Sequence, residues 1–283
     1  MKKVEICDTH NDFLTELDTD EFTSYIAKCK KNNVKVICAS FWSTEWEEEK
    51  ILDEVLLRTN ILRFLSPEFL LHIEDLWWVK DEERLEFLLE LKPFSCSFTW
   101  NNRNLLAGGT NAEGGLTKWG KECLERLSEA GIVVDLAHLN RKSFWQVSKN
   151  FEKNLYCSHT GFYGVKRHKR NLTDKQIDAI VESNGFVGLF FYDKCVKTGE
   201  GEFGIGDVVE NLKYFTTKWG FDNIGIGTDF YGIENYPAGL KSYDGFKNLA
   251  EGLKKEGFSE IQIEKIFYKN FLKFVERSKR KNF

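Results

Sequence analysis

The chain alternates between strand-like and helix-like segments along almost all of its 283 residues, and this alternation limits the folds open to it. Eight short segments resemble strands, and several of them are continuous apolar runs rich in β-branched or aromatic residues, which is typical of strands buried on both faces of a parallel sheet. Eight strand-then-helix units in one chain indicate an α/β fold, a (β/α)8 barrel of the TIM type. The expected strands are residues 4–9, 34–41, 69–74, 94–100, 132–138, 155–159, 186–191 and 223–230.

Amphipathic segments separate these strands. In residues 118–130 the apolar positions share one helical face, and Gly131 follows as a stop signal. Thr173 and Gln176 have the spacing of a capping box, which predicts a helix start there. Residues 259–276 carry apolar residues at helical spacing, and we expect them to form an extra C-terminal helix that closes the barrel. Apart from this last segment, the expected helices are residues 20–31, 48–64, 82–91, 118–130, 141–150, 174–183, 208–219 and 245–255.

A doubly wound open sheet is the alternative arrangement of such units. No glycine-rich phosphate loop follows the first strand, however, so the pattern favours the barrel. With 3 prolines and no low-complexity stretch, the sequence shows no domain boundary, and residues 1–283 are expected to form a single barrel domain. The longest irregular piece, residues 101–117, contains two Gly-Gly pairs and is expected to be a mobile loop over one mouth of the barrel.

Composition excludes several classes of protein. The 40 basic and 44 acidic residues are spread along the chain, and no basic stripe marks a nucleic-acid surface. No apolar run reaches the roughly 18 residues of a membrane helix, and the first residues do not resemble a signal peptide. The 7 cysteines form no C-x-x-C pair and predict buried thiols in a reducing compartment. We therefore expect a cytoplasmic protein without a nucleic-acid or membrane partner.

Reactive side chains follow the expected strands. In a barrel of this type, active-site groups lie at the C-terminal ends of the strands. His10 and Asp12 end the first strand, and because they are two residues apart they point to the same side and can bind one cation. Of the 5 histidines, three belong to this group. The remaining members end the third, fifth, sixth and eighth strands: Glu74, His138, His159 and Asp229.

Each of these residues also has a structural interpretation when taken alone. A single histidine at a strand end is more often structural than a ligand, Glu74 is compatible with a solvated loop carboxylate, and Asp229 with a helix cap. Together, three imidazoles and two carboxylates supply enough ligands for two divalent ions if Glu74 bridges them. Two metals about 3.5–4 Å apart can hold a hydroxide between them and polarise a carbonyl. Asp229 would take the proton of that water and deliver it to a leaving amine, so the set predicts hydrolysis of an amide-type bond.

A series of motifs runs through nearly the whole chain: Asp8-Thr9-His10-Asn11-Asp12, Phe41-Trp42-Ser43, Val134-Asp135-Leu136-Ala137-His138, Ser158-His159, Arg170-Asn171-Leu172-Thr173-Asp174, Gly225-Ile226-Gly227-Thr228-Asp229-Phe230 and Asn270-Phe271-Leu272-Lys273-Phe274. In their content and order they resemble the membrane dipeptidase (renal dipeptidase) family, which consists of zinc peptidases of the amidohydrolase type. The resemblance implies a metal-dependent hydrolase barrel that acts on free dipeptides. The family often accepts a D-residue on the C-terminal side.

The resemblance also implies a role for each ligand. His10 and Asp12 would bind one Zn²⁺, Glu74 would bridge, and His138 with His159 would hold the second Zn²⁺. Manganese, cobalt or iron would fit the same imidazole and carboxylate ligands. The sequence leaves open which dipeptides are cleaved, which stereochemistry is preferred, and whether the protein forms a homodimer.

Two further residues are implied to bind the substrate. Arg170 would pair with the C-terminal carboxylate of a dipeptide, because its planar fork suits a carboxylate; taken alone, it resembles a surface cation near a helix start. Trp100 stands where members such as the renal enzyme carry a histidine. Taken alone, it could also be a buried aromatic residue with a purely structural role. Its indole N–H can donate one hydrogen bond but cannot carry a proton. Glu74-Asp75-Leu76 also replaces the usual E-G-G, and His72 is expected to lie behind the site rather than to bind metal.

Trp100 motivates an alternative within the same class of enzyme. The chain could be a related binuclear amidohydrolase that acts on another small amide, a lactam or an acylated amino acid. A third hypothesis is a catalytically dead barrel that serves as a binding protein. Such a protein would be expected to have lost ligands or the proton carrier, whereas this sequence contains all of them.

Overall fold

Eight parallel strands form one sheet in which each strand pairs with the next along the chain. The computed structural model describes residues 4–18, 20–62, 68–150 and 154–279. The sequential strand order confirms the predicted α/β barrel and excludes the doubly wound sheet, in which the order would reverse. The strands are β1 (Ile6–Asn11), β2 (Val34–Trp42), β3 (Glu68–Glu74), β4 (Ser95–Ser97), β5 (Val133–Asp135), β6 (Tyr156–Thr160), β7 (Phe186–Leu189) and β8 (Ile224–Ile226).

The barrel is closed by hydrogen bonds just beyond β8. The backbone N–H of Asp229 donates to the His10 carbonyl at 3.1 Å, and the N–H of Asp12 donates to the Phe230 carbonyl at 3.0 Å. Asn11 and Phe230 form a parallel bridge between them. This closure brings the end of the first strand and the segment after the last strand side by side.

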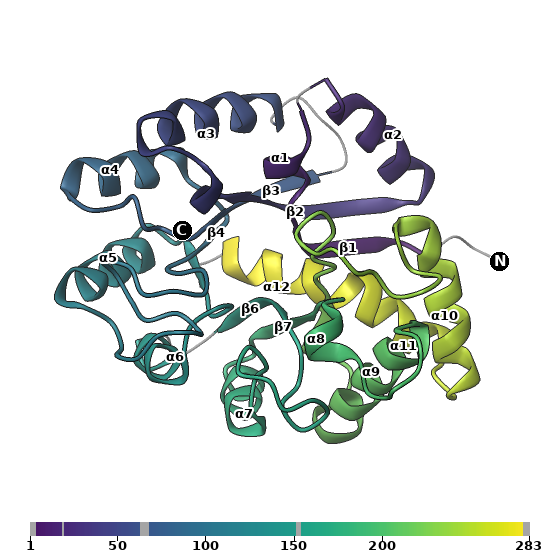
Figure 1. Cartoon of the computed structure of the whole chain (residues 1–283). Helices are drawn as coiled ribbons and strands as arrows, with labels where there is room; N and C mark the ends of the chain where they lie inside the picture. Colours follow the sequence, from purple (N-terminus) through teal and green to yellow (C-terminus); the bar gives the residue numbers. More distant parts are fainter. Residues whose placement is uncertain (1–3, 19, 63–67, 151–153, 280–283) are drawn as a thin grey trace.

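Helices surround the sheet (Figure 1). All eight strands and all the expected helical segments are found at their expected places, apart from the end of the predicted helix 48–64, where residues 63 and 64 lie outside the described residues. The four-residue helices α1 and α8 were not predicted. The helices are α1 (Phe13–Glu16), α2 (Phe22–Lys31), α3 (Glu48–Leu62), α4 (Glu82–Leu91), α5 (Lys118–Glu129), α6 (Arg141–Ser148), α7 (Asp174–Glu182), α8 (Asp193–Val196), α9 (Ile205–Trp219) and α10 (Phe246–Lys255).

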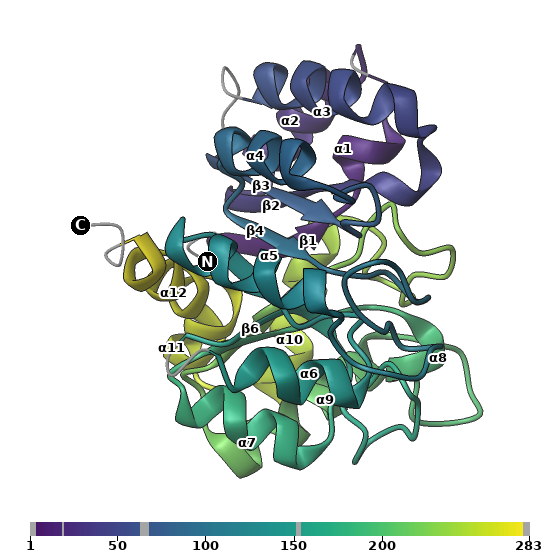
Figure 2. The same cartoon turned by 90° about the vertical axis from the view of Figure 1, so that its left-hand side faces the viewer.

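The C-terminal segment confirms the predicted extra helix at one end of the barrel. It consists of α11 (Glu260–Glu264), a π-helical turn (Lys265–Lys269) and α12 (Asn270–Lys279). From α12, the ring of Phe274 stacks on Tyr156 with centroids 5.1 Å apart and fills the barrel interior from the N-terminal ends of the strands. In Figure 2 the strands point away from α12, toward the loop that carries α8.

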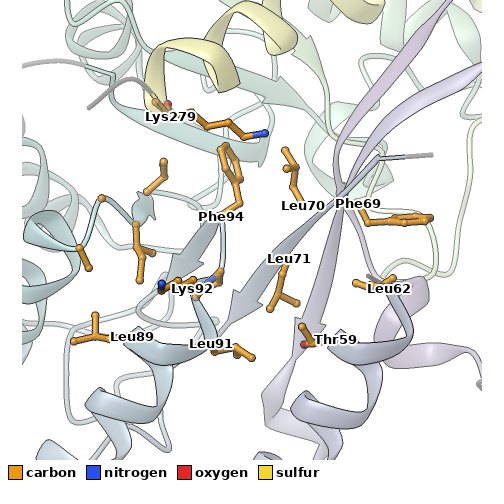
Figure 3. Close-up of a pocket in the computed structure, with 16 residues that line it drawn as sticks. Thr59, Leu62, Phe69, Leu70, Leu71, Leu89, Leu91, Lys92, Phe94 and Lys279 are labelled. Atoms are coloured by element: carbon orange, nitrogen blue, oxygen red, sulfur yellow. The ribbon is translucent and has the colours of Figure 1, made fainter. Parts of the chain in front are cut away.

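A cavity of about 590 Å³ also lies at this N-terminal end (Figure 3). Apolar side chains such as Leu70, Leu71 and Phe94 line most of it, with the amines of Lys92 and Lys279 nearby. None of the described residues that line it is a histidine, a cysteine or an acid. The predicted site residues lie instead at the opposite end of the barrel, where the strands end.

Three further expectations concern the loop 101–117, the cysteines and the membrane. The loop lies at the C-terminal mouth, where Asn104 Nδ2 donates to Asp75 Oδ1 at 2.9 Å and Asn140 Nδ2 donates to the carbonyls of Ala112 and Gly114 at 2.8 Å. These bonds hold it in the conformation seen, and its mobility stays a prediction. All 7 cysteines are buried free thiols, as predicted. In the described part of the chain, no helix has the length and apolar character needed to cross a membrane.

Candidate metal centre

The end of β1 places two predicted ligands at the centre of the barrel mouth. His10 Nε2 lies 3.5 Å from Asp12 Oδ2, and both side chains are buried. Asp229 Oδ1, from the segment after β8, lies 3.9 Å from the same nitrogen. The closure of the barrel thus gathers one imidazole and two carboxylates, whose potential ligand atoms all lie within 4.8 Å of one another.

Glu74, the last residue of β3, lies between this group and a second one. Its Oε2 is 3.4 Å from His10 Nε2, whereas its Oε1 is 3.2 Å from His138 Nε2 and 3.9 Å from His159 Nε2. The two histidine Nε2 atoms are 2.9 Å apart. One carboxylate therefore offers one oxygen to each group, which is the arrangement that a bridging ligand requires. The structure brings all six predicted residues of the cluster together.

The cluster fits divalent cations on three observations. His10 Nε2 and Glu74 Oε1 are buried and have no hydrogen-bond partner among the described residues, although such atoms are rarely left unpaired. Imidazole nitrogens and carboxylate oxygens are ligands that suit zinc. Gly232 also leaves space here, because a Cβ at this position would lie 2.8 Å from Asp229 Oδ1 and closer still to Asp12 Oδ2.

Burial and charge shift the proton affinities of these groups in opposite directions. Burial lowers the pKa of His10, but the Asp12 and Glu74 carboxylates outweigh it and hold that pKa well above its usual value. Burial, followed by the Asp12 charge, raises the pKa of Asp229 to about 8. Burial also depresses the pKa of His138 and of His159, and nearby cationic groups add to the effect. The metal-free cluster therefore holds protons on the side of His10 and Asp229.

Metal uptake should consequently release protons at neutral pH. The pKa of His10 and of Asp229 is raised in the metal-free protein. His10 would bind in its deprotonated form, and nearby cations would favour the Asp229 carboxylate, so both should lose protons. We expect metal affinity to rise between pH 6 and 8 by about tenfold per pH unit for each proton released. Calorimetric titration in two buffers of different ionisation enthalpy measures this proton count. A heat that is the same in both buffers would contradict the expectation.

Small polar residues orient the imidazoles. Ser158 Oγ lies 2.7 Å from His159 Nδ1 and 3.5 Å from His10 Nδ1. On the other side, Asn101 Oδ1 lies 3.0 Å from His138 Nδ1. Contacts at Nδ1 fix the ring so that Nε2 points toward the cluster, as they do in metal sites. The sequence analysis gave no role to Ser158 or Asn101. The one signal was their position, since Ser158 directly precedes His159 and Asn101 directly follows Trp100.

Asp8 is another supporting residue to which the sequence analysis gave no role, although it begins the first motif. This buried carboxylate accepts hydrogen bonds from Thr228 Oγ1 and from Tyr243 Oη, both at 2.6 Å. It also accepts from the Thr228 backbone N–H at 2.8 Å. Asp8 thereby ties the end of β1 to the segment that carries Asp229. His72 lies behind the cluster, as expected, with Nδ1 2.8 Å from Ser95 Oγ.

Several residues at the mouth adopt left-handed backbone conformations, which residues other than glycine seldom do. His138 has φ 64° and Asp229 has φ 61°. Such strain is common at functional sites, because it aims a side chain that regular structure would not. Asp75, at the first glycine position of E-G-G, has φ 62°. The backbone shape that favours glycine is present, and bonds from Thr44 and Asn104 to the Asp75 carboxylate support it.

A cavity of about 400 Å³ opens beside the cluster, and both predicted substrate-binding residues line it together with His138 and Asp229. Arg170 is only 8 % exposed; its Nη2 donates to the His159 carbonyl at 2.8 Å, and its guanidinium lies 5.4 Å from the centre of the Phe190 ring. Trp100 is half-buried, with its ring centre 6.2 Å from that of His138. The predicted residues therefore share one cavity.

A parallel (β/α)8 barrel with histidines and carboxylates gathered at its C-terminal mouth is typical of metal-dependent hydrolases. The chain belongs to the membrane dipeptidase family, peptidase family M19, whose model matches residues 68–282. This confirms the family that the motifs indicated, a family of dipeptidases.

Two proteins are similar to this chain in sequence, and two solved structures share its fold. A protein of Klebsiella pneumoniae described as an uncharacterized protein in the pqqA 5' region is 26% identical over 188 residues, which cover 62% of this chain and 69% of that protein. Dipeptidase tcpJ of Claviceps purpurea (strain 20.1) is 24% identical over 161 residues, 57% of this chain and 38% of that protein. The crystal structure of the M19 metallopeptidase dipeptidase AC has a TM-score of 0.89 and 21% identity, covering 98% of this chain and 99% of that one. A metallopeptidase from Rhodobacter sphaeroides, liganded with a phosphinate mimic of L-Ala-D-Ala, has a TM-score of 0.88 and 20% identity over 98% of this chain and all of that one, 100%.

Proposed function

We propose that this protein is a zinc-dependent dipeptidase with two metal ions, which hydrolyses the peptide bond of free dipeptides. The observation that carries the proposal is the position of Glu74, with one oxygen toward His10 and the other toward His138 and His159. A carboxylate shared in this way serves two cations better than one. Family membership supports the dipeptidase activity, and the donor set supports zinc.

The residues divide the metals between them. His10 and Asp12 would hold one ion, His138 and His159 the other, and Glu74 would contact both. When bound, two such ions polarise a substrate carbonyl and lower the pKa of a water molecule, so that both reactants are activated at neutral pH.

The chain's own side chains would bind the substrate and move the proton. One N–H group of Arg170 donates to the His159 carbonyl and thereby fixes the guanidinium. Its other donors would remain for the C-terminal carboxylate of a dipeptide. Asp229 lies on the same cavity beside His10, and we assign to it the transfer of a proton from water to the leaving amine. Trp100 would contribute apolar contact and a single N–H donor to the bound substrate.

The test is hydrolysis of L-Ala-L-Ala and L-Ala-D-Ala by protein of known metal content, before and after treatment with a chelator. We propose that a C-terminal D-residue is accepted, since the similar Rhodobacter sphaeroides enzyme carries a mimic of L-Ala-D-Ala. Cleavage that a chelator stops, with about two metals per chain, supports the proposal. Two bound metals without cleavage of either dipeptide would overturn the dipeptidase assignment.

Replacing Arg170 by glutamine should raise KM for dipeptides by about 10- to 100-fold, because a hydrogen bond to a charged group contributes roughly 1.5–3 kcal/mol. The bound metal should remain, since Arg170 is not one of the ligand groups. Arg167→Gln is the matched control, because Arg167 is exposed and lies outside the residues that line the cavity. Unchanged KM in Arg170→Gln would refute the carboxylate clamp.

A second candidate function keeps the metal centre and changes the substrate. Trp100 lines the cavity where a proton-carrying histidine is expected in related dipeptidases, and this favours a binuclear amidohydrolase acting on another small amide, a lactam or an acylated amino acid. A panel of dipeptides, N-acyl amino acids and lactams separates the two functions by their kcat/KM values. Preference for a substrate without a free amino group would support the second candidate.

A further inference from the structure

One wall of the substrate cavity carries more positive charge than a single carboxylate needs. Besides Arg170, the side chains of His168, Lys169 and Lys194 line it. Lys169 is exposed at the mouth and directly precedes the buried Arg170. Within the described ranges, neither Lys169 nor Arg170 has a carboxylate within salt-bridge distance.

Hydrogen bonds hold this wall in place. His168 Nδ1 accepts the backbone N–H of Arg170 at 3.2 Å and lies 3.0 Å from Cys195 Sγ. The segment 168–170, after β6, is thereby joined to α8, after β7. Burial, followed by the charges of surrounding cations with Lys169 first among them, lowers the pKa of His168. The environment of His168 is therefore positive.

The carboxylates of the cavity stand near other partners. Asp229 belongs to the metal cluster, and Asp193 accepts the Lys194 backbone N–H at 2.8 Å. Lys194 Nζ lies 5.8 Å from the centre of the Tyr192 ring. Contact with Tyr192, and then the charges of Asp193 and Glu234, raise the pKa of Lys194, so acidic groups act on this cation. Among the described residues, Lys169 and Arg170 remain as two adjacent cations with no carboxylate within salt-bridge distance. Arg170 is assigned to the C-terminal carboxylate, which leaves Lys169 for a second negative group.

We propose that the preferred substrate is a dipeptide whose C-terminal residue is acidic, with its side-chain carboxylate bound by Lys169 and its α-carboxylate by Arg170. This inference rests on the proposed dipeptidase function and specifies its substrate class. The two carboxylates of a C-terminal Asp or Glu are separated by only a few bonds, as suits two cations on adjacent residues. A neutral side chain would leave Lys169 without an anion in the complex.

The experiment compares kcat/KM for L-Ala-L-Asp with that for L-Ala-L-Asn, which has nearly the same shape but no side-chain charge. The wild-type protein should prefer Asp by about tenfold, as expected for one charge-assisted hydrogen bond. The preference should shrink toward one in Lys169→Gln and should weaken with added salt. The same pair with a D-residue at the C-terminal position repeats the comparison for that stereochemistry.

Lys166→Gln is the matched control, since Lys166 is exposed in the same loop but does not line the cavity. The Asp/Asn preference should persist in this variant. An equal loss of the Asp/Asn preference in Lys166→Gln and Lys169→Gln would indicate a long-range electrostatic effect of the whole loop and overturn the contact with Lys169. A wild-type ratio near one, with both dipeptides cleaved, would overturn the acidic-substrate inference alone. Failure to cleave any of these dipeptides, with L-Ala-L-Ala and L-Ala-D-Ala included in the panel, would overturn the proposed function together with the inference.

Discussion

Replacing Glu74 by glutamine should remove most of the bound metal and lower kcat/KM for dipeptides by a factor of about 10³ or more, equivalent to roughly 4 kcal/mol of transition-state stabilisation. The substitution keeps the shape but converts one of the two oxygens into an NH2 group, which cannot serve as a ligand. Because each oxygen faces a different group of donors, the loss affects the site shared by both ions. Metal analysis of the purified variant and a hydrolysis assay measure the two effects.

Glu68→Gln is the matched control for this prediction. Glu68 begins the same strand at the opposite end of the barrel, where it pairs with Lys279 at the surface. Exposed ion pairs contribute little to stability, so metal content and activity should be unchanged. If Glu74→Gln retained two metals and full activity, the bridging role would have to be abandoned.

The fold could be predicted from the sequence because its signals are local. Most strand residues are buried on both faces, so that several strands appear as apolar runs, and the helices between them have an apolar face. The predicted strand ends were less accurate next to the candidate site. Strands β4, β5 and β8 end three to four residues before the predicted ends, because the chain leaves the sheet there. His138 and Asp229 follow β5 and β8 with positive φ values, and no periodic pattern encodes such a turn.

The predicted ligands could be found because strand ends in a barrel meet at one mouth. The residues that support them were harder to find, because their partners are distant in sequence. Asp8 binds Thr228, 220 residues away, and Tyr243, 235 residues away. Ser158 likewise contacts His10 across 148 residues. Serine, threonine and asparagine are common throughout the chain, so neither composition nor spacing distinguishes the few that orient a ligand.

Two further expectations also remain predictions. One is the cytoplasmic location, which rests on the buried free cysteines, and the other is a homodimer. Both can be measured directly, by fractionation of cells and by sedimentation of the purified protein.

Replacing Asp229 by asparagine should lower kcat by a factor of about 10² to 10⁴, the usual contribution of a positioned proton carrier. Asparagine keeps the size of the side chain and one oxygen, but it cannot accept and release a proton. The largest loss should therefore appear in kcat, with a smaller change in KM, because the proposed contact of Arg170 with the substrate carboxylate would remain. Steady-state kinetics with metal content measured on the same sample separates this loss from a loss of metal.

The pH profile distinguishes proton transfer from simple support of the site. In the metal-free protein, burial and the Asp12 charge raise the pKa of Asp229 to about 8; bound cations favour the carboxylate and should move that pKa downward. Since a base acts only when deprotonated, wild-type kcat should fall as the pH drops through the pKa of Asp229. Asp229→Asn should lack this acidic limb, while Asp193→Asn, a change on the same cavity away from the cluster, should retain it. A variant that keeps the acidic limb and most of kcat would assign the proton to another group.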